Sequence, residues 1–290
     1  MLSLIVNPHA GGGRAGRALP EVQARLTSSG LEHHVERTDS LAHARELAVR
    51  AAVENELAVA FGGDGLIGAV ADALRSTDGA LGVLPGGRGN DFARVLGIPL
   101  DPLAACAVLK DGQIKQIDLG QVGHSTFIGI ASCGFDSEAN RVANETRLVR
   151  GNLVYAYGAL RALAGWKPAR FEVRLDGAEH VHVITGYTVA AANSGAYGGG
   201  MMLAPDASLS DGLLDIVLVS DASKLRFLRS LPAVFKGEHV NDPNVQVLRA
   251  REVEVSADRP FTMYADGDPI GELPVTVRAL PAAVKVMVPR

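Results

Sequence analysis

Three glycine-rich segments, each preceded by a short apolar run, most constrain what this chain can fold into. They lie at residues 10–16, 62–65 and 86–89, and each stands between an expected strand and an expected helix. Short apolar strands that alternate with helices of about 10–15 residues are typical of βαβ units and a parallel sheet. Ligands of open α/β sheets bind outside the carboxyl ends of the strands, so we expect the three segments to border one site.

The first 120 residues have the pattern of an open α/β domain. Short apolar runs alternate there with stretches whose apolar positions recur at helical spacing. The expected strands are Leu2–Val6, Glu32–Glu36, Leu57–Phe61 and Leu81–Leu84. The expected helices are Arg14–Ser29, Leu41–Glu54, Leu66–Arg75, Asp91–Leu96 and Pro102–Lys110.

Beyond Gly120 the pattern changes to consecutive strands with Asp-Gly turns, which favours antiparallel pairing. We therefore expect an α/β fold in two domains, an open α/β domain at 1–120 and a β-rich, sandwich-like domain at 121–281. Residues 282–290 are a candidate segment for a return to the first domain. The expected strands are Phe127–Ala131, Phe171–Leu175, Val181–Ala192, Leu213–Val219, Val245–Val255, Phe261–Ala265, Val275–Arg278 and Val284–Val288. The expected helices are Asp136–Ala164, with a candidate break at Gly151, and Ser223–Lys236.

The composition argues against several classes of protein. Lys and Arg number 28 against 32 Asp and Glu, a net charge of −4, which does not suit a broad nucleic-acid-binding surface. Cys106 and Cys133 lack metal-ligand spacing, so we expect two buried apolar residues. The N-terminal segment lacks the basic start of a signal peptide, and no apolar run reaches the roughly 18 residues of a membrane span. We expect a cytoplasmic protein.

The first glycine segment matches two phosphate-binding patterns poorly. Gly11, Gly13 and Gly16 satisfy the dinucleotide pattern G-x-G-x-x-G, and Glu36 follows at the spacing of a ribose-binding acid. Consecutive glycines satisfy this pattern easily, however, and Pro8 places a turn before the first of them. The Walker A pattern fails because no Lys follows the last glycine. What the segment does offer is a set of backbone N–H groups at a helix start, which suits an anion.

The second and third segments add charged side chains. Asp64 stands among glycines, where its carboxylate would repel a phosphate unless a metal ion or a substrate hydroxyl lies between them. Arg88, together with Arg14 of the first segment, offers a guanidinium that can clamp phosphate. Asn90 and Asp91 follow and are also suited to cap the next helix.

Taken in order, these motifs resemble the bacterial diacylglycerol kinase and lipid kinase family, which is related to sphingosine and ceramide kinases. The resemblance extends over nearly the whole chain. It is carried by Asn7-Pro8…Gly11, Gly62-Gly63-Asp64-Gly65, Pro85-x-Gly87-x-x-Asn90-Asp91-Phe92, Gly134-Phe135-Asp136, Asn193-Ser194-Gly195-x-Tyr197-Gly198-Gly199-Gly200, Pro205-x-Ala207-x-x-x-Asp211-Gly212-x-Leu214-Asp215 and Asp266-Gly267-Asp268.

The resemblance implies ATP in the first domain, of the Rossmann-like type shared with NAD kinases, and a lipid against the second. It implies Mg²⁺ on the Asp211 carboxylate with the Ser208 and Leu213 carbonyls. It also implies a proton acceptor at Asp268, with Asp266 and Asp64 as alternatives. The implied nucleotide contacts are Asn7, Pro8, Gly11, Thr38, Gly62, Gly63, Asp64, Gly65, Leu66, Gly68, Gly87, Arg88, Asn90 and Asp91.

Several positions depart from the family pattern. Leu66, Gly68 and Ala69 stand where the family has Thr, Asn and Glu, and Arg88 replaces a Thr. Asp268 replaces the terminal Glu of Asp-Gly-Glu. These losses leave two hypotheses open, an ATP-dependent lipid kinase and a degenerate family member that binds nucleotide or lipid without catalysis. An NAD kinase-like enzyme would not need the Pro-x-Gly-x-x-Asn-Asp-Phe motif, and a nicotinamide dehydrogenase would leave the second and third segments unexplained.

The segment Ser223–Lys236 suggests how such a protein reaches a lipid. It carries four cations and no acid among Leu and Phe residues, a composition that suits transient contact with an anionic membrane at the inner face. A helix that packs its apolar side on its own domain has the same pattern. The sequence leaves the oligomeric state open, a homodimer included.

Overall fold

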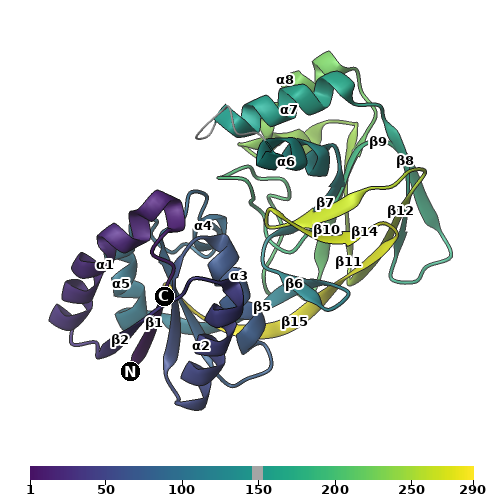
Figure 1. Ribbon diagram of the computed structural model, residues 1–290. Coiled ribbons are helices and arrows are strands. Elements are labelled where there is room, and N and C mark those ends of the chain that lie inside the picture. The colour runs from purple at the N-terminus through teal and green to yellow at the C-terminus, as the bar shows by residue number, and fades with distance from the viewer. Residues whose placement is uncertain (146–152) are drawn as a thin grey trace.

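The first half of the chain (residues 1–122) folds into a parallel sheet with helices on both faces. The computed structural model describes residues 1–145 and 153–290. The strand order is β2-β1-β3-β4, and each neighbouring pair is parallel. Helices α1 and α5 cover one face and α2 and α3 the other (Figure 1). The elements are β1 (Leu2–Val6), α1 (Ala10–Ser28), β2 (His33–Arg37), α2 (Leu41–Val53), β3 (Leu57–Gly62), α3 (Asp64–Leu74), β4 (Ala80–Pro85), α4 (Asp91–Val95), α5 (Pro102–Asp111) and β5 (Gln113–Val122).

Helix α1 begins irregularly because its first residues are glycines. Gly11, Gly12 and Gly13 have φ values of 61°, 71° and 85°, a left-handed conformation that residues with a side chain seldom adopt. Regular helix therefore starts near Arg14, where the sequence predicted it.

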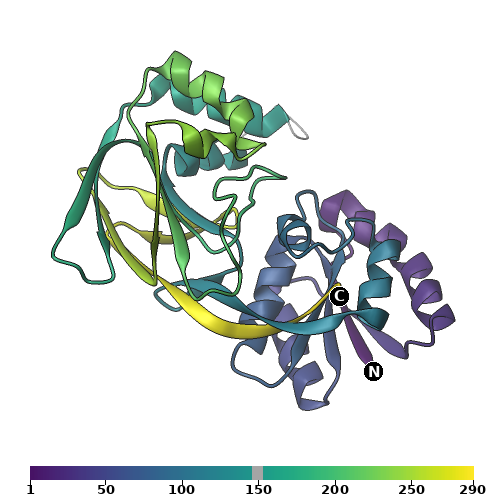
Figure 2. The same ribbon diagram turned by 180° about the vertical axis from the view of Figure 1, so that it is seen from behind.

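The second half (residues 123–290) is a mostly antiparallel sheet whose helices gather at one end (Figure 1, Figure 2). Its strands follow the order β14-β13-β7-β9-β8-β12-β15, and β10 pairs with β9 and β11. The elements are β6 (Ser125–Phe127), β7 (Ile130–Gly134), α6 (Phe135–Glu145), α7 (Leu153–Gly165), β8 (Ala169–Leu175), β9 (Val181–Ala192), β10 (Leu214–Ser220), α8 (Lys224–Val234), the 3₁₀ helix η1 (Glu238–Asn241), β11 (Val245–Ala250), β12 (Glu252–Ala257), β13 (Thr262–Ala265), β14 (Asp268–Glu272) and β15 (Val275–Val288).

Three expectations for this half are corrected. The strand expected at 127–131 is divided into β6 and β7, because residues 128 and 129 turn toward the Asp266 carboxylate. The strand expected at 245–255 is divided into β11 and β12 at Arg251. The strands expected at 275–278 and 284–288 are one strand, β15. Strand β5 of the first half was not predicted. The candidate helix break at Gly151 lies outside the described residues.

Strands β5 and β15 join the two halves as one long antiparallel pair. Strand β15 pairs with β12 in the second half and continues into the first, where Lys285 and Val286 pair in parallel with Ala80 and Leu81 of β4. The C-terminus therefore lies in the first half (Figure 1, Figure 2).

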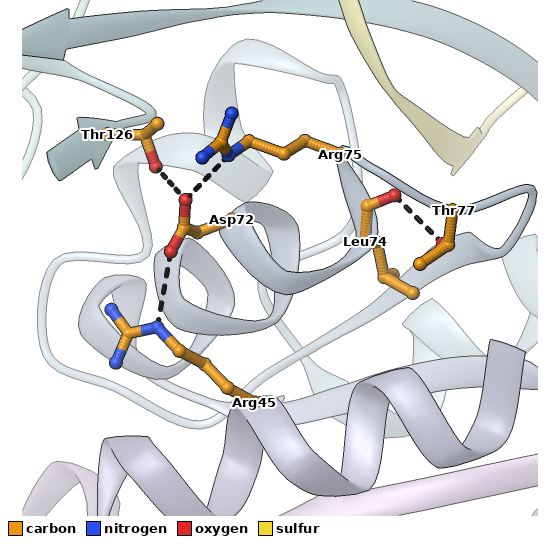
Figure 3. Close-up of polar contacts among 6 residues, drawn as sticks. All are labelled: Arg45, Asp72, Leu74, Arg75, Thr77 and Thr126. Carbon is orange, nitrogen blue, oxygen red and sulfur yellow. Dashed lines mark hydrogen bonds and ion pairs between the residues drawn. The ribbon is translucent and has the colours of Figure 1, made fainter. Parts of the chain in front are cut away.

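A carboxylate on α3 connects the halves at a second place. Asp72 accepts hydrogen bonds from Arg45 of α2 at 3.2 Å and from Arg75 at 3.0 Å. It also accepts one from the Thr126 hydroxyl of β6 at 2.8 Å (Figure 3). This side chain thus holds the β6 hairpin against the helices of the first half.

The structure also bears on the two cysteines and on the search for a membrane-spanning segment. Cys106 and Cys133 are free and buried, as expected. In the described ranges, no helix is both long enough and apolar enough to span a membrane.

Candidate active site

The three glycine-rich loops pack against one another at the carboxyl ends of β1, β3 and β4. The N–H of Gly86 donates to the carbonyl of Gly62 at 2.7 Å. A Cβ atom at Gly87 would lie 2.5 Å from Gly63 Cα, and one at Gly11 would lie 2.4 Å from the Gly86 oxygen. Backbone segments this close leave no space for a side chain, so these glycines are required by the packing of the loops themselves.

Gly65 differs from these glycines. A Cβ atom there would meet no atom within 4 Å, so open space lies beside the first turn of α3. The N-terminus of a helix carries unpaired N–H groups and a partial positive charge, which favour an anion. The fold does not require glycine at this position, whereas the approach of a phosphate would.

The two arginines of the loops are held differently. Arg14 Nη1 donates to the Gly87 carbonyl at 3.0 Å and so connects the first loop to the third. Arg88 is exposed, and within the described ranges no hydrogen bond or ion pair is recorded for its guanidinium. Arg14 is therefore part of the loop framework, and Arg88 is available to a ligand.

Asn90 and Asp91 stabilise contacts other than the helix cap that the sequence suggested. Asn90 has a φ of 51°, caps nothing with its side chain, and binds both the N–H and the carbonyl of Gly87, at 2.8 and 3.2 Å. The buried Asp91 accepts the N–H of Gly199, from the second half, at 2.7 Å and lies 3.8 Å from Arg94. The third loop is therefore closed by Asn90 and joined to the second half by Asp91.

Other predicted nucleotide residues have roles in the fold. Asn7 and Thr38 bind backbone groups two residues further along the chain. The carbonyl of Pro8 lies against α1. Leu66 is buried in the core, and its N–H donates to the Gly63 carbonyl at 3.0 Å. A Cβ atom at Gly68 would lie 4.0 Å from the side chain of Ile128.

Asp64 stands in the first turn of α3 and faces the third loop. Its Oδ1 accepts the N–H of Phe92 at 3.2 Å, and its Oδ2 lies 3.3 Å from the position a Cβ would take on Gly89. Burial raises the pKa of Asp64, and the Asp91 carboxylate raises it further, while backbone N–H groups lower it. Two carboxylates thus lie close together at the edge of the glycine-rich loops.

A third carboxylate reaches this place from the second half. Asp266 occupies a two-residue hairpin turn with Gly267, both with positive φ, and accepts the N–H groups of Ile128 at 2.8 Å and Gly129 at 3.0 Å. The residue is solvent-exposed at its turn, but its carboxyl points inward. Desolvation by the surrounding protein is the largest cause that raises its pKa to about 6, and the Asp64 carboxylate contributes.

Asp268 follows the turn at the start of β14 and is exposed. In the described part of the chain no hydrogen bond is recorded for its carboxylate, in contrast to that of Asp266. The turn thus fixes one acid by two N–H groups and presents the other to solvent.

The predicted metal residues lie on a loop that contacts β5 and β15. Asp211 is exposed, and its Oδ1 accepts the Leu213 N–H at 3.1 Å. The Ser208 hydroxyl accepts the Ser210 N–H at 3.3 Å. Among the described residues, no cluster of three or more His, Cys, Asp or Glu side chains could hold a metal ion. An ion here would depend on one carboxylate and on carbonyl oxygens, which are the hard donors that Mg²⁺ takes.

Two sets of residues near the site were not predicted as site residues. Buried Asp118 on β5 accepts the N–H of Gly212 and that of Ala282, each at 2.7 Å, and so fixes the loop of Asp211. Tyr197 donates to Asp136 at 3.2 Å and holds the loop that carries Gly199. The motifs of the resemblance contain Asp136 and Tyr197, but nothing in their spacing indicates that they meet.

Comparisons with known proteins agree with this arrangement. The family model of the diacylglycerol kinase catalytic domain matches residues 1–122, and that of the YegS C-terminal NAD kinase beta sandwich-like domain matches residues 129–288. The diacylglycerol kinase of Mycobacterium tuberculosis (strain ATCC 25618 / H37Rv) is 38% identical over 298 residues, which cover 100% of this chain and 95% of that protein. The chain belongs to the diacylglycerol kinase family.

Further relatives extend the comparison. The diacylglycerol kinase of Bacillus subtilis (strain 168) is 33% identical, with 99% of this chain and 96% of that protein covered. A crystal structure of a diacylglycerol kinase from Bacillus anthracis str. Sterne is similar in fold, with a TM-score of 0.75 at 20% identity over 99% of this chain and 96% of that one. The predicted family and the predicted two-part α/β fold are thus confirmed.

Proposed function

We propose that this diacylglycerol kinase family member transfers the γ-phosphate of ATP to the free hydroxyl of diacylglycerol. The observation that carries the proposal is the meeting of three carboxylates from both halves, Asp64, Asp91 and Asp266, beside the glycine-rich loops and the N-terminus of α3. The names of the relatives support the lipid substrate. The comparisons offer no support for a non-catalytic role.

In this proposal the first half holds ATP. The open space at Gly65 and the N-terminus of α3 accept phosphate oxygens, and Arg88 supplies a guanidinium from the third loop. The lipid hydroxyl oxygen attacks the γ-phosphorus in line, the bond between the γ-phosphorus and the bridging oxygen breaks, and ADP leaves. The second half presents the lipid.

We assign the hydroxyl proton to Asp268. Its carboxylate makes no hydrogen bond to any residue that the structure describes, whereas both oxygens of Asp266 already accept backbone N–H groups. Asp266 would then position the turn that carries Asp268. Asp64 would hold a cation or the substrate hydroxyl next to the phosphates. Asp266 and Asp64 are the alternative proton acceptors.

The loop at Asp211 has a donor set that fits Mg²⁺. The Asp211 carboxylate with the Ser208 and Leu213 carbonyls would hold the ion, which would supply positive charge that stabilises this loop. Asp118 would support this site, because it accepts the N–H of Gly212, next to Asp211, and the N–H of Ala282 on β15.

The assay measures transfer of labelled γ-phosphate from ATP to diacylglycerol in mixed detergent micelles. We expect Asp268→Ala to lower kcat by about 10²–10⁴-fold, the usual contribution of a general base, and Asp268→Glu to retain activity. Asp64→Ala should abolish most activity, and the exposed Asp111→Ala is the matched control. Wild-type activity in the Asp64 variant would contradict the placement of Asp64 in the active site.

The acceptor is tested in the same assay by substitution of the lipid. A long-chain base, a ceramide, an undecaprenol-like alcohol and NAD each replace diacylglycerol in turn. Label on NAD would favour the NAD kinase-like hypothesis, and label on another lipid would change the substrate but not the reaction. Because the proposed substrate is a membrane lipid, the protein would act by transient contact with the inner face of the membrane.

A further inference from the structure

Helix α8 carries a broad apolar face with a packed part and an exposed part, an inner and an outer stripe. One stripe packs on the protein, where Phe227 stacks on Tyr187 with 4.1 Å between ring centroids and contacts Phe135 at 4.9 Å. Leu231 adjoins the same buried cluster. This stripe alone accounts for a helix that packs on its own domain, which was one of the two interpretations of the sequence.

The second stripe faces away from the protein. Leu225 and Phe235 are 58% and 56% exposed, and Leu228 is exposed as well. At 100° per residue Leu225 and Leu228 lie about 60° apart on α8, and Phe235 follows directly at the end of the helix. Large apolar side chains that remain in water on one helix face indicate an interaction surface.

The four cations of Ser223–Lys236 also fall into two groups, those bonded within the protein and those exposed beside the outer stripe. Lys224 donates to the Ala164 carbonyl at 2.9 Å, and Arg226 pairs with Asp242 at 2.9 Å, so both are used within the protein. Arg229 and Lys236 are exposed on the side of the outer stripe, and no ion pair is recorded for either within the described ranges. A net charge of −4 for the whole chain makes two unpaired cations on this face more notable.

The neighbouring helix α7 also carries exposed side chains near α8. Leu160 is 54% exposed and Arg161 is exposed beside it. Helices α7 and α8 lie side by side at one end of the second half in both views (Figure 1, Figure 2). We define the outer α8 face as Leu225, Leu228, Arg229, Phe235 and Lys236, with Leu160 and Arg161 of α7.

We propose that the outer α8 face docks the protein on an anionic bilayer, with its Leu and Phe side chains among the acyl chains and its cations at the headgroups. The charge pattern selects this partner, because Arg and Lys flanking exposed apolar groups match anionic lipid headgroups above acyl chains. The proposal rests on the proposed function, since a bilayer is what presents diacylglycerol to an enzyme.

The test measures binding to phosphatidylcholine vesicles with and without phosphatidylglycerol, in the absence of ATP. Leu225→Asn/Phe235→Asn should weaken binding to both vesicles at least about tenfold, because two apolar side chains lose their burial. Arg229→Glu/Lys236→Glu should weaken binding by about 30-fold or more, and only where phosphatidylglycerol is present.

Matched controls carry the same changes on the first half. Val49→Asn/Val53→Asn alters two exposed apolar residues of α2, and Lys110→Glu/Lys115→Glu alters the charge by the same amount. Both controls should bind as the wild type does. All four variants should turn over micellar diacylglycerol normally, so loss of vesicle binding with normal turnover supports docking.

Other outcomes overturn the proposal. A wild type that does not bind vesicles, or outer-face variants that bind as the wild type does, would contradict it. Dissociation of a dimer by the outer-face variants would instead assign this face to a second copy of the chain. Vesicle binding that depends on the face, without phosphorylation of micellar diacylglycerol, would leave docking supported and refute the proposed substrate.

Discussion

Gly65→Ala tests whether Gly65 is needed for ligand binding and not for folding. The added methyl group meets nothing within 4 Å, and residue 65 lies in the first turn of α3. Replacing glycine by alanine at a helical position stabilises a protein by about 0.4–1 kcal/mol, largely because the unfolded chain loses freedom. We therefore expect the free energy of unfolding to rise slightly, while ATP binding weakens because the methyl group occupies the proposed seat of a phosphate.

Gly87→Ala is the matched comparison. Its Cβ atom would lie 2.5 Å from Gly63 Cα and 2.9 Å from Asn90 Oδ1, so the backbone must shift. Overpacking of this kind costs about 1–3 kcal/mol, and we expect both stability and ATP binding to fall. Urea unfolding gives the first quantity and calorimetric titration with ATP the second. ATP binding by Gly65→Ala that equals wild type would refute the placement of the phosphates.

Three further predictions concern charged groups. Arg88→Ala should weaken ATP binding by roughly 1.5–3 kcal/mol, the contribution of a hydrogen bond to a charged group, and activity gained by Arg88→Thr would indicate that Arg88 obstructs the site. Asp211→Asn should reduce the rise in Tm that Mg²⁺ causes in the wild type, and equal rises would place the ion elsewhere. Burial raises the pKa of Asp136 to about 6, so the folded state binds its proton more tightly than the unfolded state. The wild type should therefore lose stability relative to Asp136→Asn, by up to about 3 kcal/mol, as pH rises from about 4 to about 6, and parallel urea-unfolding curves at the two pH values would contradict this.

The four parallel strands of the first half and all three loops were predictable because their signal is local. Apolar runs mark buried parallel strands, and glycine marks the turns after them. Strand β5 escaped prediction because its first four residues are exposed and three of them are polar, so it has no alternating pattern of burial. Strand β15 was expected as two strands because Pro281 and Ala282, the latter with a φ of 50°, mark a bulge that the strand nevertheless crosses.

The candidate site was predictable only residue by residue. Glycine clusters and lone acids indicated which residues bear the chemistry, but the contacts that assemble them join distant parts of the chain. Asp91 meets Gly199, and Asp118 meets Ala282, across separations of 108 and 164 residues. No spacing rule covers such distances, since they depend on how the two sheets are joined.

The pairing of β15 with β4 has a consequence for synthesis in the cell. Until residues 285 and 286 leave the ribosome, the edge of β4 beside β15 lacks that partner. Domains commonly fold in order as they emerge, but here the nucleotide-side sheet waits for the last part of the chain. The edge of β4 therefore stays unpaired while the rest of the chain is synthesised. Other chains can pair with such an edge, so we expect chaperones to bind the nascent first half there.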